Sequence, residues 1–289
     1  MGNINNFEEE DIYWEQTLEE KRDLAKKNFK DKKRQSNKTP EQTDGRIKKS
    51  FHVKDLISIQ PKTETQRHVF REYQQNPEKH FFMTGSAGTG KTFIGMYLGL
   101  QDVLDPATPY EKLVIVRSNV ESGAPLGFLP GDAEEKMAQF EYPYSDICNE
   151  LFEVSKSYEN LKEIGKVVFS PTAFLRGRSL NDSVILVDEI QNMNFGELDT
   201  IITRVGYNSK IIFCGDYRQN DLINKRNNQS GFYPFIDIIS SLENRFSIHE
   251  FGHNDIVRSG LVKDYIIRKE TFFANEVEDH EKSISNSKK

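Results

Sequence analysis

The sequence predicts an α/β fold with a mostly parallel sheet that helices cover on both faces. Short aliphatic runs of strand length alternate with segments of helical character through the middle of the chain. Strands that alternate with helices form parallel sheets, and both faces of such sheets are buried. Side chains that directly follow the strands should therefore gather along one edge of the sheet, where folds of this kind bind their ligands.

Each element is expected from its own local pattern. The first strand is a short apolar run ahead of a Gly-rich loop, and a helix follows that loop. The second strand is β-branched, the fourth holds four consecutive aliphatic residues, and the fifth is aliphatic and ends in Gly-Asp. In chain order, the expected elements are strand 80–84, helix 91–104, strand 113–117, helix 132–153, strand 166–170, strand 184–188, helix 196–205 and strand 210–214.

Both ends of the chain differ from this middle region in composition. Residues 1–20 carry seven acidic side chains and no basic one, whereas residues 21–49 carry twelve Lys or Arg against four acids. The basic block fits either a contact with a phosphate backbone or a solvated tail. We expect a charged extension over residues 1–50 that is partly helical or disordered, a globular domain over 51–275 and a disordered tail over 276–289.

The overall composition fits a cytoplasmic protein with polar appendages. Hydrophobic residues make up 36% and charged residues 29% of the chain, and the net charge is −6. No run of eighteen apolar residues predicts a membrane span, and the N-terminus lacks the basic start and apolar stretch of a secretory signal. The two cysteines are far apart in apolar contexts, which favours buried free thiols in a reducing compartment.

A phosphate-binding loop is expected between the first strand and the first helix. The run is Gly85-Ser86-Ala87-Gly88-Thr89-Gly90-Lys91-Thr92. Glycines let backbone N–H groups approach phosphate oxygens, and the N-terminus of the next helix points at the same anion. Lys91 supplies charge for the outer phosphates, and the Thr92 hydroxyl can ligate Mg²⁺. These residues predict a P-loop that binds a nucleoside triphosphate together with Mg²⁺.

Two further strand ends supply polar groups to the same edge. Asp188 and Glu189 follow the aliphatic fourth strand, so Asp188 is expected to hold the metal and Glu189 to orient and partly deprotonate the attacking water. The fifth strand ends in Gly-Asp and is followed by Gln219, whose amide could sense the γ-phosphate and the water. Taken alone, the acidic pair could be two surface residues at a strand end, and the Gly-Asp element could be a turn before a helix cap. Beside a P-loop, the catalytic interpretation is favoured.

A nucleic-acid contact is a further expectation from the residues. Arg117 follows the second strand, and Phe128 lies in the loop after it. An arginine and an aromatic ring in one loop suit backbone contact and base stacking, although loop packing explains Phe128 as well. Because the protein is acidic overall, such a contact would be a narrow groove rather than a broad basic face.

At this point the residues resemble a known family. The P-loop, Asp-Glu-Ile-Gln-Asn from position 188 and Gly-Asp-Tyr-Arg-Gln from position 215 are similar to the N-terminal RecA-like half of superfamily 1 helicases. The chain more specifically resembles the PhoH-like (phosphate-starvation-inducible) ATPases over about residues 60–268. The motifs that carry this resemblance are Leu-Gly-Phe-Leu-Pro-Gly at 126–131, Arg-Gly-Arg at 176–178 and Asp-Ile-Val-Arg-Ser at 255–259.

The resemblance implies a RecA-like P-loop NTPase fold and roles for several more residues. Gln66 stands where superfamily 1 proteins have a glutamine that reads adenine, which implies ATP as the nucleotide. Phosphoryl transfer needs positive charge at the γ-phosphate, and Arg258 is the first candidate for this arginine, which in a ring of subunits would act on a neighbour's site. Arg176 and Arg178 are the alternatives, and either could reach a neighbouring subunit or a nucleic acid.

Two functions from different classes remain open. The first is an ATPase that acts on or is stimulated by single-stranded nucleic acid, with RNA favoured over DNA, as a helicase-like protein or translocase. Only one RecA-like half is visible, so a cyclic homo-oligomer, a hexamer by resemblance, would supply the missing charge from a neighbour. The alternative is a nucleotide-dependent regulatory switch that binds a protein partner without remodelling nucleic acid. A P-loop kinase is a weaker third interpretation, because no acceptor site or lid is visible.

Overall fold

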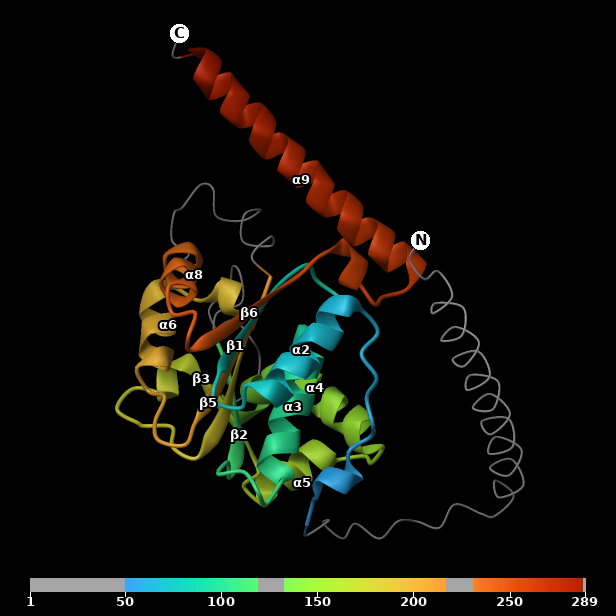
Figure 1. Ribbon diagram of the computed structural model, residues 1–289, viewed down its shortest axis with the longest axis vertical. Helices are drawn as coiled ribbons and strands as arrows, with labels where there is room; N and C mark the ends of the chain where they lie inside the picture. Colours follow the sequence, from blue (N-terminus) through green and yellow to red (C-terminus); the bar gives the residue numbers. More distant parts are fainter. Residues whose placement is uncertain (1–49, 119–132, 217–230, 288–289) are drawn as a thin grey trace, which may run out of the picture. The chain divides into compact units, whose positions relative to one another are not determined.

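The computed structural model describes residues 50–118, 133–216 and 231–287. Phe128 and Gln219, for which the sequence analysis predicts roles, lie outside these residues. The contacts divide the chain into two units, Met1–Ile47 and Lys48–Lys289. All described residues belong to the second unit, which Figure 1 shows as coloured ribbon.

Six parallel strands form the sheet of this described unit. In space they run in the order β3-β2-β4-β5-β1-β6, so β5 lies between β1 and β4. All five predicted strands are present within one residue of the expected bounds, and β6 is an addition. The strands are β1 His80–Gly85, β2 Lys112–Arg117, β3 Val167–Pro171, β4 Ser183–Asp188, β5 Lys210–Gly215 and β6 Phe246–Phe251.

Helices cover both faces of the sheet, as predicted (Figure 1). On one face lie α2 Glu64–Gln75, α3 Lys91–Leu104, α4 Ala133–Phe152 and α5 Ser157–Glu163, and on the other lie α6 Phe195–Ile202 and α8 Phe232–Ser240. Because successive strand residues point to opposite faces, Phe81 and Met83 join the core under α3 while Phe82 joins the core under α6 and α8. The predicted α/β fold is therefore confirmed.

The contact between α3 and the sheet fixes where the P-loop lies. At Gly95, an added Cβ atom would lie 2.7 Å from Leu186 Cδ1, and at Gly99 it would lie 2.8 Å from Leu113 Cδ1. Real Cβ contacts are longer, so both glycines let the helix backbone approach β2 and β4 closely. The N-terminus of α3 is thereby held against the carboxyl ends of the central strands.

The described part of the C-terminal region is a long helix. Helix α9 runs over Gly260–Ser287 and includes residues 276–287. Residues 260–287 contain no Pro, and their only Gly is the first residue, so the sequence contains no helix-breaking residue inside α9. In the described part of the chain, no helix is long and apolar enough to cross a membrane.

Candidate nucleotide-binding site

The P-loop connects β1 to α3 in a conformation that requires its glycines. Gly85, Gly88 and Gly90 have φ angles of 120°, 73° and 85°, which residues with side chains rarely adopt. At Gly85 an added Cβ atom would also lie 2.0 Å from the carbonyl oxygen of Phe251. Helix α3 begins directly after Gly90, so its unsatisfied N–H groups lie at the loop, where the sequence predicts an anion site.

Lys91 is buried inside this loop. Its Nζ donates to the carbonyl oxygens of Gly85 at 2.9 Å and Ser86 at 2.7 Å, and lies 3.3 Å from Thr89 Oγ1. Burial lowers the pKa of Lys91, and the nearby charge of Asp216 acts in the opposite direction. The ammonium group is thus held among the loop carbonyls, one residue before the hydroxyl of Thr92.

Thr92 and Asp188 form the pair expected for a metal. The Thr92 hydroxyl donates to Asp188 Oδ1 at 2.8 Å, which joins the start of α3 to the end of β4. Both groups are oxygen donors of the kind that Mg²⁺ prefers, so the residues present fit this ion. The second carboxylate oxygen, Oδ2, accepts a hydrogen bond of 3.0 Å from the buried Tyr144 hydroxyl of α4. Tyr144 therefore fixes which oxygen of Asp188 faces Thr92.

Glu189 is held in an unusual position beside Asp188. Its backbone has φ 56° and ψ 41°, a left-handed conformation that costs energy for a residue with a side chain. The Gln191 amide donates to the Glu189 carboxylate and accepts from the Asp216 N–H at 2.9 Å, so one buried amide ties β4 to the end of β5. Burial raises the pKa of Asp188. The pKa of Glu189 is raised mainly by burial and also by the negative charge of Asp188.

Arg117 lies with these acids. It ends β2 directly opposite Asp188 in the register of the parallel pair. Burial alone would lower its pKa, but Tyr144, Glu189 and Asp188 together raise it, and its side chain also hydrogen-bonds Tyr144. The guanidinium carbon lies 5.7 Å from the ring centre of Phe140. The sequence interpretation of Arg117 as a nucleic-acid contact stays a prediction, and in the structure its side chain lies beside Asp188, Glu189 and Tyr144.

Gln66 contacts the P-loop from α2. Its Nε2 donates to the Thr89 carbonyl oxygen at 3.0 Å, and its Oε1 accepts from the Lys62 N–H at 2.7 Å. The side chain is only 6% exposed. Gln66 therefore links the segment before α2 to the loop, while one N–H and one lone pair of its amide keep the capacity to contact a base.

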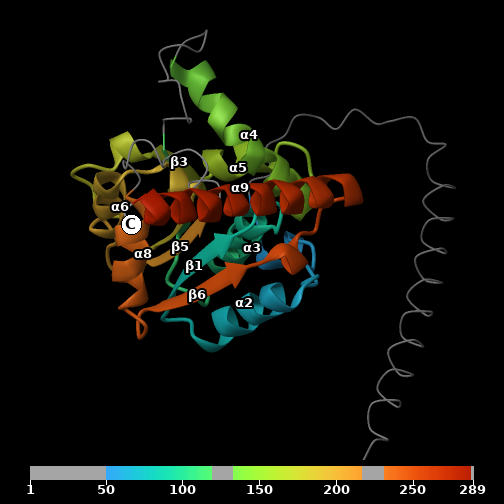
Figure 2. The ribbon, with the colours of Figure 1, turned by 90° about the horizontal axis from the view of Figure 1, so that it is seen from above.

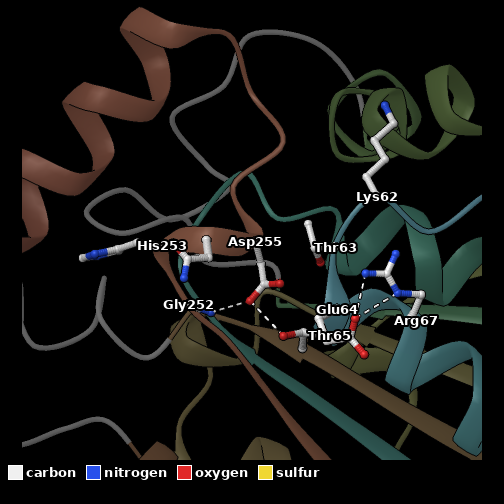
Figure 3. A pocket seen from close by; sticks show the side chains of 9 residues that line it. Lys62, Thr63, Glu64, Thr65, Arg67, Gly252, His253 and Asp255 are labelled. Atoms are coloured by element: carbon white, nitrogen blue, oxygen red, sulfur yellow. Dashed lines mark hydrogen bonds and ion pairs between the residues drawn. The ribbon is translucent and has the colours of Figure 1, made fainter. Parts of the chain in front are cut away.

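A cleft of about 640 Å³ opens at the start of α2 (Figure 3). The Asp255 carboxylate bridges the two sides of this cleft. Its Oδ2 accepts hydrogen bonds from Thr65 Oγ1 at 3.0 Å and from the Gly252 N–H at 2.9 Å. The cleft thus lies where the start of α2 meets the chain that leaves β6. Its lining residues are Lys62, Thr63, Glu64, Thr65, Arg67, Gly252, His253, Asn254 and Asp255.

The three remaining arginines lie in two places. Arg258 is at the P-loop of its own chain: an added Cβ atom on Gly88 would lie 2.8 Å from Arg258 Cγ, and the Val257 N–H donates to the Gly88 carbonyl oxygen at 3.0 Å. Arg176 and Arg178 are exposed beyond β3 at the edge of the sheet. Four strand spacings, or about 19 Å, separate β3 from β1, the strand that leads into the P-loop.

Sequence reasoning missed the roles of Tyr144 and Gln191. Gln191 stands three residues after Asp188, within a run noticed only as part of the resemblance. Tyr144 lies in the middle of α4 with no motif around it, so its contact with Asp188 depends on how α4 packs on the sheet.

The loop, the Thr92–Asp188 pair and the insertion of β5 between β1 and β4 define a P-loop nucleotide-binding protein. The family model described as PhoH-like protein matches residues 58–268, so the chain belongs to the PhoH-like family. This confirms the resemblance found in the sequence.

Curated relatives agree with this assignment. A PhoH-like protein of Synechocystis is 37% identical over 67% of this chain and 58% of its own length, and one of Bacillus subtilis is 32% identical over 72% and 63%. The chain thus spans somewhat less than two thirds of the length of these curated relatives. The Hef helicase domain of Pyrococcus furiosus superposes with a TM-score of 0.39 at 14% identity, covering 67% of this chain and 39% of that one. Unliganded Pif1 from Bacteroides gives a TM-score of 0.33 at 18% identity, covering 70% and 43%.

Proposed function

We propose that this PhoH-like protein binds ATP with Mg²⁺ and hydrolyses it. The observation that carries the proposal is the hydrogen bond between Thr92 and the buried Asp188, with Glu189 held beside it. The loop N–H groups and Lys91 would bind the phosphates, and Thr92 with Asp188 would hold the metal. When bound, Mg²⁺ neutralises charge on the phosphate oxygens.

Glu189 would orient the attacking water and accept its proton. The raised pKa of Glu189 brings the carboxylate closer to the working pH, which favours a general base. Gln191 is the positioning residue, because its amide donates to the Glu189 carboxylate and is itself fixed by the Asp216 N–H. Arg258 would add positive charge on the phosphate side, within the same chain.

The base and ribose of the nucleotide would lie in the cleft of Figure 3. Two contacts support this placement: Gln66 joins the α2 side of the cleft to the P-loop, and Val257, two residues after Asp255, bonds Gly88. Gln66 would then contact the edge of adenine, which both donates and accepts hydrogen bonds.

Single-stranded nucleic acid, RNA rather than DNA, is the proposed second ligand of a helicase-like ATPase or translocase. Arg176 and Arg178 support this role, because both are exposed beyond β3 together with Phe174, whose ring is 58% exposed. In a cyclic homo-oligomer, a hexamer by resemblance, the same arginines would instead face a neighbouring subunit. A regulatory switch that binds a protein partner is the alternative.

The test is ATP turnover with and without single-stranded RNA and DNA, together with the particle mass in solution. Lys91→Ala should lose tight binding of MgATP. Glu189→Gln should bind MgATP but turn over about 100-fold or more slowly, because the amide keeps the shape and loses the base. Normal turnover by Glu189→Gln would remove the assigned base. Turnover that neither nucleic acid changes would favour the regulatory switch.

A further inference from the structure

Helix α9 contacts the P-loop through a carboxylate. The Ser86 hydroxyl of the loop donates to Glu270 Oε2 at 3.0 Å, and the Nε2 atom of His253 lies 2.7 Å from the same oxygen. The Glu270 side chain is only 7% exposed. In Figure 2, which is seen from above, α9 crosses in front of the sheet, and Figure 1 shows that the helix projects away from the sheet toward its C-terminal end. A residue from the C-terminal helix is thus bonded to the second residue of the phosphate-binding loop.

One turn earlier, α9 also makes an apolar contact with the P-loop. Ile266 is 7% exposed, and its Cδ1 lies 3.4 Å from where a Cβ atom on Gly88 would be. Residues four apart lie on one face of a helix, so Ile266 and Glu270 together form the face of α9 that meets the loop. Leu261 and Tyr265 are 83% and 65% exposed and belong to other faces.

The carboxylate at this contact has the same sign of charge as the phosphates that the loop binds. Positive φ angles, the start of α3 and Lys91 make the loop a site for polyphosphate. A carboxylate against that site repels phosphate, and the repulsion is stronger where water is excluded. A helix that served only to cover the loop could do so with neutral or basic side chains.

We propose that α9 is an autoinhibitory latch, in which Glu270 holds Ser86 and must be released when a nucleotide's phosphates enter the loop. The proposal rests on the proposed function only in requiring that the P-loop binds ATP. In the latched state, Glu270 adds negative charge to the site and α9 covers the loop. Nucleotide and Glu270 therefore oppose each other, and the affinity for nucleotide is reduced by the fraction of molecules that are latched.

The chain between the loop and α9 allows this release and transmits it. Gly260 begins α9, and no atom lies within 4 Å of where its Cβ would be, so the hinge position is open. Arg258 lies two residues before this start, and its Cγ is close to Gly88. Movement of α9 would therefore also move the arginine that we place on the phosphates, which couples nucleotide entry to the position of Arg258.

The first test compares Glu270→Gln with Asp264→Asn. The two substitutions remove the same charge from the same helix, but Asp264 is exposed and is no part of the contact. Equilibrium titration with a fluorescent ATP analogue and Mg²⁺ should show about tenfold tighter binding by Glu270→Gln, as expected when a state holding nine tenths of the molecules is removed. Asp264→Asn should bind like the wild type.

A second measurement needs no variant. Hydrogen exchange of the amides in 262–273 should become faster in the wild type when MgATPγS saturates the site, because the latch opens. Equal or weaker binding by Glu270→Gln overturns the latch, and so does exchange that stays the same or slows. If the wild type binds no nucleotide and Glu270→Gln does not either, the proposed function fails. Binding by the wild type with no gain in the variant removes the latch alone.

Discussion

Replacing Tyr144 with Phe tests whether the Asp188 carboxylate is held ready for a metal. The substitution removes one hydroxyl, which donates to Asp188 Oδ2 at 3.0 Å and also bonds Arg117, and it keeps the ring in the core. Because Asp188 is only 5% exposed, water does not readily replace the lost bond. We expect Tyr144→Phe to weaken the interaction with Mg²⁺ without removing the metal's direct ligands.

The expected magnitude follows from the type of bond. A hydrogen bond to a charged group contributes about 1.5–3 kcal/mol, and partners that orient a metal ligand typically change metal affinity by about 10–100-fold. The Tyr144 bond also lowers the pKa of Asp188 against the dominant effect of burial, which raises it. Without this bond the pKa of Asp188 rises further, so protons compete better with Mg²⁺ and the loss should be larger at acidic pH.

The assay is the Mg²⁺ concentration that gives half-maximal binding of ATP, measured at two pH values. Tyr142→Phe is the matched control, because Tyr142 lies on the same helix with 65% of its side chain exposed. The control should leave the Mg²⁺ dependence unchanged, and melting temperatures should show that both variants fold. An unchanged Mg²⁺ requirement in Tyr144→Phe would refute the view that Asp188 acts as a pre-oriented ligand.

Two other predictions concern the nucleotide and the pH. Gln66→Ala should weaken ATP binding and reduce the preference for ATP over GTP, because the base loses a two-sided hydrogen-bond partner; equal turnover of ATP and GTP by the wild type would contradict this. Burial lowers the pKa of both His80 and His249 from 6.5 to about 4, so the folded state prefers the neutral imidazoles and loses stability as the pH falls from about 6.5 toward about 4. Each histidine should contribute about 1–2 kcal/mol to the stability lost between pH 7 and pH 5. Denaturant unfolding of His80→Asn at both pH values should show that loss reduced by this amount, and an equal loss in the variant would show that His80 does not titrate as described.

The parts of the site that the sequence predicts are those built from neighbouring residues. The P-loop and the pair Asp188-Glu189 each lie on one short segment at a strand end, and five buried strands are visible as aliphatic runs. Strand β6 was missed because it carries polar residues that are nevertheless buried. Its Ser247 and His249 contact the side chain of Glu72 in α2, so their burial depends on a partner far away in the sequence.

Strand order and helix packing account for the rest. Arg117 was predicted to contact nucleic acid because it follows a strand, and the sequence did not show that β2 lies next to β4, which places Arg117 opposite Asp188. No local pattern states which strands are neighbours. Tyr144 and Glu270 likewise reach the site from α4 and α9, and their roles follow from how those helices pack on the sheet.

The position of Arg258 leads to a prediction about how subunits would cooperate. The sequence analysis considered this arginine as a residue given to a neighbour's site, but its Cγ is close to Gly88 of its own loop and Val257 bonds that same glycine. An arginine that stabilises charge on the transferred phosphoryl group acts only where it can reach that group. We therefore expect Arg258 to act within its own subunit, so that mixing inactive Lys91→Ala with inactive Arg258→Ala restores no turnover. Arg176 and Arg178 follow β3, which lies four strands away from β1, and they are the residues that a neighbour could receive. Mixing Lys91→Ala with the double variant Arg176→Ala/Arg178→Ala should restore part of the activity if the subunits form a ring, because one protein keeps the arginines and the other keeps the loop. Rescue with Arg258→Ala would show that the arginine crosses to another subunit, and a fully active monomer would leave the ring without support.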